Sequence, residues 1–273
     1  MTLTSLPATG AGIALPDLVD YLDQYLRIRE VGDSPNAVNG LEVENSGRIG
    51  RLIAAVDASQ ETIDGVVDSI SRSGDAGPPL LLVHHGLFWD GNIPVVGRRY
   101  RRLKALLSHD IALYAAHIPL DLHSEVGNNV VLAGMLELAT AGMFGRHLGQ
   151  EIGVWGTWRD GGALPRESLV SRLDDLLETQ AMLIPGGPAE CTRVGVLTGA
   201  GGSAIADAHA AGLDTLVTGE GAHHTYFDAM EWGINVIYAG HYATEQVGVR
   251  ALAEHLGSRF GLPWEFHRHP TGL

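Results

Sequence analysis

The sequence is poor in cysteine and in positive charge, and each shortage excludes a class of protein. Its 273 residues contain one cysteine, Cys191, so an intrachain disulfide and a Cys-rich zinc finger are both excluded. Lys and Arg number 18 against 32 Asp and Glu, and the net charge of −14 argues against binding to the nucleic-acid backbone. Any bound metal must therefore be held by nitrogen and oxygen ligands.

Long apolar runs are absent as well. No run approaches the roughly 20 residues that a membrane-spanning helix needs. The first residues lack the basic region and long apolar core of a secretory signal. We therefore expect a cytoplasmic protein with no membrane partner, long enough to bury a large core in one large domain or two ordinary ones.

What the chain does contain is a set of histidines placed at or shortly after the ends of short apolar runs. Six of the 13 histidines follow four runs that are typical of buried strands. They are His84 and His85 after Leu80–Val83, His117 after Ile111–Ala116, His223 and His224 after Thr215–Val217, and His241 after Val236–Ala239. Ligands of open α/β sheets bind beyond the carboxyl ends of strands, so this placement predicts one clustered site.

His241 and His117 each have an acid four residues further on. Glu245 follows His241 and Asp121 follows His117, and residues spaced by four share one face of a helix. Two metal ions ~3.5–4 Å apart need a bridging carboxylate, which either acid can supply. The alternative for Asp121 is a first-turn acid favoured by the helix dipole.

His84 and His85 form the other prominent pair. Adjacent side chains of an ideal strand point to opposite faces, but at a strand end followed by Gly86 both can reach one crevice and face two ions. The alternative is one buried, hydrogen-bonded imidazole and one exposed imidazole. Imidazole with carboxylate suits zinc, iron, manganese or nickel without choosing among them.

A second group of side chains is suited to orienting ligands or to acid–base catalysis. Its members are His117, Glu220, His223 and His224. Polar groups that are simply hydrogen-bonded at strand ends explain each of them equally well.

Two further motifs have a structural and a functional interpretation. Gly199–Ser203 follows a strand and opens a helix, so its amides could cradle a phosphate, but it lacks a GxGxxG spacing and a P-loop lysine and is more typical of a tight turn. Arg98, Arg99, Arg101 and Arg102 lie at a predicted helix start, where positive charge opposes the dipole. This suggests an anionic ligand or partner, and a solvated basic face is the simpler explanation.

The order of segments predicts an α/β protein with two similar, interlinked halves, whose mixed sheets are flanked by helices and whose metal site lies in the cleft between the halves. RLIAAVD, LLVHHG and LYAAHIPLD match RVGVLTG, LVTGEGAHH and VIYAGHYATE in order and spacing. We place the first half at residues 1–138, a connecting segment at 139–192 and the second half at 193–273.

LLVHHGLFWDG, LYAAHIPLD and the segment that ends in GHYATE together resemble the GTP cyclohydrolase 1 type 2 homologue family. These dinuclear-metal proteins are related to the NGG-interacting factor and generally form toroidal hexamers. The resemblance covers residues 51–138 and 193–256. It implies a homohexamer with two divalent ions per chain and GTP or another nucleotide as a possible substrate.

The resemblance also implies a ligand set. Its members would be His84, His85, Asp121, His241 and Glu245, with Glu245 bridging the ions, His84 and His241 completing one site, and His85 and Asp121 completing the other. The chain departs from the family pattern at Gly86, where a proline is usual, at Ile118-Pro119, where Thr-Asn is usual, and at Glu220, where aspartate is usual. None of these departures removes a ligand.

Two functions follow from these residues. The first is a metal-dependent hydrolase that opens the imidazole ring of guanine or cleaves a nucleotide phosphoester, with His117, His223 or His224 moving protons. The second is a metal-binding regulatory or metal-chaperone protein that catalyses nothing. The sequence alone does not separate them.

Overall fold

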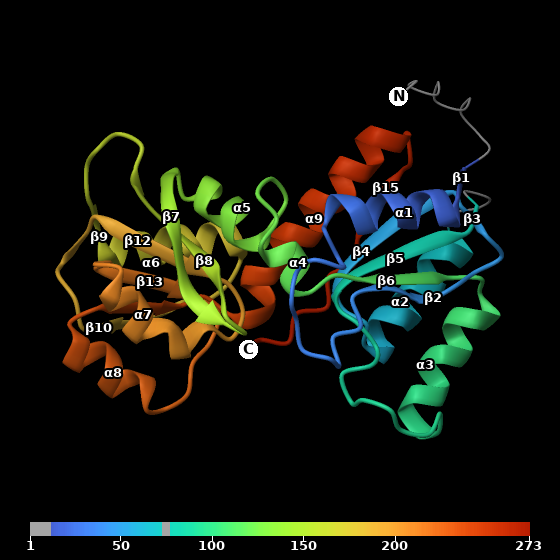
Figure 1. The fold of residues 1–273 in the computed structure, drawn as a ribbon, viewed down its shortest axis with the longest axis horizontal. Helices are drawn as coiled ribbons and strands as arrows, with labels where there is room; N and C mark the ends of the chain where they lie inside the picture. Colours follow the sequence, from blue (N-terminus) through green and yellow to red (C-terminus); the bar gives the residue numbers. More distant parts are fainter. Residues whose placement is uncertain (1–11, 73–76) are drawn as a thin grey trace. The chain divides into compact units, whose positions relative to one another are not determined.

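The structure is a computed structural model that describes residues 12–72 and 77–273. It forms two compact units, unit 1 within Met1–Leu120 and Val249–His269, and unit 2 within Asp121–Gly248 and Pro270–Leu273. Each unit is a sheet with helices on both faces (Figure 1). The chain is therefore a mixed α/β protein, as its alternation of strands and helices predicts. Among the described residues no helix has the length and apolar character needed to cross a bilayer.

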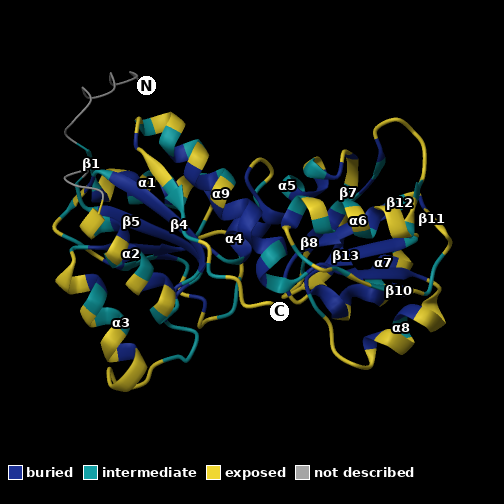
Figure 2. Ribbon diagram, turned by 180° about the vertical axis from the view of Figure 1, so that it is seen from behind, coloured by how far each residue is buried: buried dark blue, intermediate teal, exposed yellow. Residues whose placement is uncertain are grey.

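Unit 1 contains a five-stranded sheet in the order β15-β4-β5-β6-β2, which is parallel except for β2. Its elements are β1 (Ile13–Ala14), α1 (Leu15–Tyr25), β2 (Gly40–Val43), β3 (Arg48–Ile49), β4 (Arg51–Asp57), α2 (Gln60–Arg72), β5 (Pro79–His85), α3 (Gly97–Ser108), β6 (Ala112–Ala115) and β15 (Trp264–Phe266). Alternate strand residues such as Ile53, Leu81 and Leu113 pack against α2 and α3. The central strands are buried along their length (Figure 2), which explains why they are continuous apolar runs.

Unit 2 contains a six-stranded sheet in the order β10-β14-β13-β12-β8-β7, in which β12, β13 and β14 are parallel. Its elements are α5 (Asn128–Met135), β7 (Leu138–His147), β8 (Gln150–Trp158), β9 (Leu164–Pro165), α6 (Arg166–Leu177), β10 (Met182–Pro185), β11 (Glu190–Cys191), β12 (Arg193–Leu197), a 3₁₀ turn (Gly201–Ala204), α7 (Ile205–Ala210), β13 (Thr215–Thr218), α8 (Thr225–Trp232) and β14 (Asn235–Tyr238). Two helices, α4 (Ile118–Asp121) and α9 (His241–Phe260), contribute residues to both units.

The two sheets share a pattern that the sequence match predicts. In unit 1 the parallel strands run β4-β5-β6, and an antiparallel strand, β2, flanks β6. In unit 2 the parallel strands run β12-β13-β14, and an antiparallel strand, β10, flanks β14. In each unit the third parallel strand leads into a helix that carries the His-x3-acid motif, since His117 directly precedes α4 and His241 opens α9.

The boundaries between the compact units follow Leu120, Gly248 and His269, whereas the sequence-based division places its boundaries after residues 138 and 192. Residues 139–192, which the sequence assigns to a connection, form β8, α6, β10 and nearly all of β7, and much of the second sheet is built from them. The β7–β8 hairpin is hard to recognise because glycines interrupt its alternation. Two of these glycines are required by packing, since a Cβ at Gly153 would lie 2.8 Å from the Phe144 ring and one at Gly156 would lie 2.4 Å from the Ala139 carbonyl oxygen. The last part of α9 and β15 belong to unit 1.

Candidate metal-binding residues

In unit 1 the end of β5 brings two imidazoles together. His84 is fully buried, and its ring centroid lies 4.7 Å from that of His85. The ring of His117, which follows β6, lies 5.0 Å from His84 and 5.6 Å from His85. One ring nitrogen of each of the three residues lies within 4.8 Å of the others, so these side chains could hold a metal ion.

The second ring nitrogen of each of these histidines is held by an oxygen acceptor. His84 donates Nδ1–H to the Ala116 carbonyl oxygen at 2.9 Å, and His85 donates Nδ1–H to the Asp57 carboxylate at 2.8 Å. His117 donates Nδ1–H to Asp33 at 3.0 Å. Each imidazole is thereby fixed with its lone pair on Nε2, which is the arrangement usual in metal-binding histidines.

Two acids of unit 1 are missing from the sequence-based set, namely Asp57 and Asp33. Helix α2 is capped by Ser59, whose Oγ accepts the Thr62 N–H at 3.1 Å, and not by Asp57. Asp57 instead stands opposite His85 in the β4–β5 register, directly after a buried strand. Its place at the end of a buried strand could have identified Asp57 from the sequence. Asp33 lies in a loop, where no sequence pattern indicates a role.

Asp33 is an ionised anchor for His117. Burial acts to raise the pKa of Asp33, but the hydrogen bond and charge of His117 outweigh it, with help from Asn39 and the Ile118 N–H, and lower the pKa to about 2. The carboxylate therefore stays charged at neutral pH and favours a donating Nδ1–H on His117.

In unit 2 the candidate ligands begin at the first residue of α9. His241 follows Gly240, whose φ is 90°, and Glu245 lies one helical turn further on. The His241 Nε2 and Glu245 Oε2 atoms are 3.1 Å apart, and Glu245 is 3% exposed. The shared helix face that the spacing predicts is thus present, and the helix starts at His241 itself.

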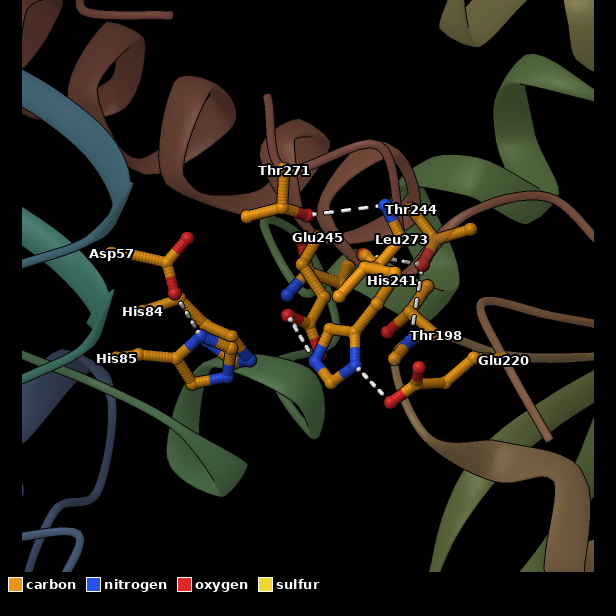
Figure 3. Close-up of polar contacts among 12 residues, drawn as sticks. Asp57, His84, His85, Thr198, Glu220, His241, Thr244, Glu245, Thr271 and Leu273 are labelled. Carbon is orange, nitrogen blue, oxygen red and sulfur yellow. Dashed lines mark hydrogen bonds and ion pairs between the residues drawn. The ribbon is translucent and has the colours of Figure 1, made fainter. Parts of the chain in front are cut away.

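Glu220 orients His241 from the other side of the ring. His241 donates Nδ1–H to the Glu220 carboxylate at 2.8 Å, a contact that Figure 3 shows together with the Glu245 contact. The hydrogen bond to Glu245 is the main reason that the pKa of His241 rises to about 9, against the opposing effect of burial, and Glu220 adds to the rise. An orienting role for Glu220 requires this contact with His241.

Asp121 is the remaining predicted ligand. It is 7% exposed at the end of α4 and accepts a hydrogen bond from the Asn128 side-chain amide at 2.8 Å. The side-chain oxygen Oδ1 of Asn128 in turn accepts the Gly248 N–H of α9 at 2.7 Å. Asn128 therefore links Asp121 to the helix that carries His241 and Glu245.

The glycine-rich turn after β12 makes room for the Glu245 carboxylate. Gly199 has a φ of 68°, and a Cβ there would lie 2.1 Å from Glu245 Oε1. The turn is closed by the Gly201 N–H, which donates to the Gly199 carbonyl oxygen at 3.0 Å. The tight turn expected at Gly199–Ser203 is therefore present.

In the part of the chain that the structure describes, His223 and His224, the other histidines that the sequence proposes for the site, make no hydrogen bond to the residues named above. His223 and His224 are exposed where α8 begins, and His223 lies edge-on to Phe227 at a ring distance of 5.7 Å.

Arg99 is buried, pairs with Asp90 and donates to the Ile93 carbonyl oxygen at 2.9 Å. The idea that all four arginines form a solvated face is therefore wrong for Arg99, which holds the loop before α3.

At Gly86, where the family usually has proline, the side chain of Glu42 occupies the space that a Cβ would fill. A Cβ on Gly86 would lie 2.1 Å from Glu42 Oε1, and Glu42 accepts the Leu87 N–H at 2.7 Å. Burial raises the pKa of Glu42 to about 7, although the Leu87 N–H and the charge of Arg102 oppose the rise. Glu42 thus holds the turn that follows His84 and His85.

The raised pKa of Glu42 predicts a pH-dependent gain in stability for Glu42→Gln. Between pH 4.5 and about 7, Glu42 is protonated in the folded state and ionised in the unfolded state. The stabilisation from Glu42 is therefore complete below pH 4.5 and is lost as the pH rises through about 7. We expect Glu42→Gln to unfold with a higher free energy at pH 8, by at most about 3 kcal/mol, and with little change at pH 4.5. Urea titrations of the metal-free protein measure this, with the exposed Glu44→Gln as control. Equal effects of Glu42→Gln at both pH values would contradict the prediction.

These features define a two-unit α/β protein with mixed sheets whose strand ends carry oriented imidazoles and carboxylates. The chain belongs to the Duf34/NIF3 (NGG1p interacting factor 3) family, whose model matches residues 13–270. A protein named GTP cyclohydrolase 1 type 2 homolog from Deinococcus radiodurans is 44% identical to this chain, and the match covers 100% of both. A relative with the same name from Halobacterium salinarum is 42% identical over 94% of this chain and 100% of its own length.

Solved structures share the fold. The protein ybgI, described as of unknown function, has a TM-score of 0.85 and 33% identity, covering 96% of this chain and 100% of its own. The protein TTHA1606 from Thermus thermophilus has a TM-score of 0.80 and 39% identity over the same shares of the two chains. The family that the sequence resembles is thereby confirmed.

Proposed function

We propose that the chain is a dinuclear metal-dependent hydrolase that acts on a nucleotide. The proposed ligands are His84 and His85 of unit 1 and Asp121, His241 and Glu245 of unit 2. The observation that carries the proposal is that the Nδ1–H of each of His84, His85 and His241 is donated to an oxygen, so that Nε2 is the ring atom that would bind a metal. With carboxylates alongside, this donor set fits zinc, iron, manganese or nickel.

Two divalent ions at such ligands would supply Lewis acidity towards water and towards the substrate. The protein's own contribution is to fix the ligands and to handle protons. We propose Glu245 as the bridge, with His84 and His241 on one ion and His85 and Asp121 on the other. His117, His223 and His224 are proposed as proton carriers.

The name shared by the relatives supports GTP as the first substrate to test, with opening of the guanine imidazole ring as the reaction. Hydrolysis of a nucleotide phosphoester uses the same groups. The experiment is to load the full chain with each candidate metal and to assay it against GTP and other nucleotides. We expect metal-dependent turnover that is lost in Glu245→Gln.

A second function remains supported by the same ligands, namely a metal-binding regulatory or metal-chaperone protein in the cytoplasm. Tight metal occupancy without turnover on any nucleotide would favour it over the hydrolase. Self-assembly into a homohexamer is part of the proposal for either function. Light scattering that shows a single chain of 29.0 kDa would reject the assembly.

The acids that orient the histidines are expected to strengthen metal binding without being ligands. We expect Glu220→Gln and Asp57→Asn each to weaken metal binding roughly 10–100-fold, because loss of an outer partner loosens the ring that it holds. Competition with a chromophoric chelator measures the affinity, and the exposed Glu190→Gln is the matched control in unit 2. An unchanged affinity in both variants would contradict the assigned orienting roles.

A further inference from the structure

Unit 1 contains a second group of histidines, which lies at and after the end of β15. The segment stays extended past this strand, because the backbone N–H of His267 donates to the Ala54 carbonyl oxygen of β4 at 2.8 Å. Side chains of an extended segment alternate between two faces. Phe266 faces α9, where the guanidinium of Arg250 lies 4.1 Å from the centre of its ring. The residues that alternation places on the other face are Glu265, His267 and His269.

This other face packs along α2. Glu61, Gly65 and Ser69 are spaced by four residues and therefore form a row on one face of that helix. At one end of the row, Ser69 donates its Oγ–H to the Glu265 carboxylate at 2.6 Å. At the other end, Glu61 Oε1 lies 3.8 Å from His269 Nδ1. The two rows thus run side by side, with Gly65 opposite the imidazoles.

Gly65 leaves a space that two ring nitrogens approach. A Cβ at Gly65 would lie 3.1 Å from His269 Nε2 and 3.3 Å from His267 Nδ1, so both nitrogens face one point beside the helix. The centres of the two rings are 6.0 Å apart, and their planes differ by 26°. Glycine is a poor helix former, and here its missing Cβ is what admits both rings.

The other nitrogen of each ring faces a carboxylate. His267 Nε2 lies 3.4 Å from Glu265 Oε1, and His269 Nδ1 faces Glu61. The imidazoles are 14% and 20% exposed, so packing holds them in place while solvent still reaches them. Metal-binding imidazoles usually direct their second nitrogen to a partner of this kind. The nitrogens that face Gly65 are therefore in the position of ligands.

We propose that His267 Nδ1 and His269 Nε2 bind a divalent transition-metal ion, with water in the remaining coordination positions. Imidazole ligands suit zinc, copper and nickel, and copper(II) is expected to bind most tightly of the three. Calcium and magnesium are not expected to bind, because they take oxygen ligands. The inference shares no residue with the five ligands proposed above and is independent of the hydrolase function.

Copper titration of the full chain tests this site. We expect the native chain to bind one more copper(II) ion than His267→Gln with His269→Gln, in competition with a chromophoric chelator at neutral pH. The difference between the electron paramagnetic resonance spectra of the two proteins should show coupling to two imidazole nitrogens. His109→Gln, which removes an exposed histidine of unit 1, is the matched control and should keep the ion.

Glu61→Gln tests the same site without altering a ligand. The Glu61 side chain is 84% exposed, so its replacement should leave the fold unchanged. We expect the affinity for this copper ion to fall roughly 10-fold, because loss of an outer partner loosens the ring that it faces.

Equal copper content in the native chain and in the double variant, with native circular dichroism, would overturn the proposal. Where the double variant does not fold, Glu61→Gln decides, and an unchanged affinity overturns the proposal. Turnover on nucleotides is measured in parallel. Loss of one copper ion with turnover unchanged supports this site, and absence of turnover in every protein bears on the hydrolase alone.

Discussion

Glu245→Ala is expected to remove most of the bound metal from the purified protein. The substitution deletes the proposed bridge between the two ions, so the loss should exceed the roughly 10–100-fold that removal of an outer partner causes. It also removes the main cause of the raised pKa of His241, whose value should fall from about 9 towards 6.5 in the metal-free protein. Elemental analysis measures the metal, and the shift of the His241 ring proton with pH measures the pKa.

The matched control is Glu254→Ala, which makes the same change at an exposed position of the same helix. It should keep full metal occupancy. Two ions per chain retained in Glu245→Ala would contradict the assignment of Glu245 as the bridge. Glu245→Gln keeps the size of the side chain and shows whether the charge or the packing is responsible.

Gly199→Ala is expected to have a comparable effect on metal binding while the fold persists. Its Cβ would lie 2.1 Å from Glu245 Oε1 and 3.4 Å from His241 Nε2, so the carboxylate has to leave its position. The backbone adds a smaller penalty, about 1–2 kcal/mol, because φ at Gly199 is 68°. We expect a large loss of metal affinity in calorimetry together with a small decrease in Tm.

Gly149→Ala separates these two effects. Gly149 has a φ of 83° and no atom within 4 Å of its added Cβ, so the variant carries the backbone strain without the clash. It should show a decrease in Tm similar to that of Gly199→Ala and unchanged metal binding. Equal metal affinity in both variants would show that the space at Gly199 is not needed by Glu245.

The sequence was most informative where the structure depends on neighbours along the chain. His241 and Glu245 are four residues apart on one helix, so their contact follows from helical geometry alone. The parallel strands β4, β5, β12 and β13 are continuous apolar runs because both faces of each sheet are covered. The glycine-interrupted β7–β8 hairpin gave no comparable signal, and its strands were assigned to a connection.

Partners that meet across the fold were decided by the tertiary structure. Asp57 reaches His85 because the register of β4 and β5 places them opposite each other, and Asp33 reaches His117 from a loop 84 residues away in sequence. The same holds for Glu42 beside Gly86 and for Gly199 beside Glu245, where a missing Cβ leaves the space that a carboxylate fills. By itself, the sequence determined the α/β class, the family and the helix face of His241 and Glu245, because these depend on local spacing. Only the tertiary structure decided which acids fix the imidazoles and which glycines make room for them, because strand register and packing bring together residues that are distant along the chain.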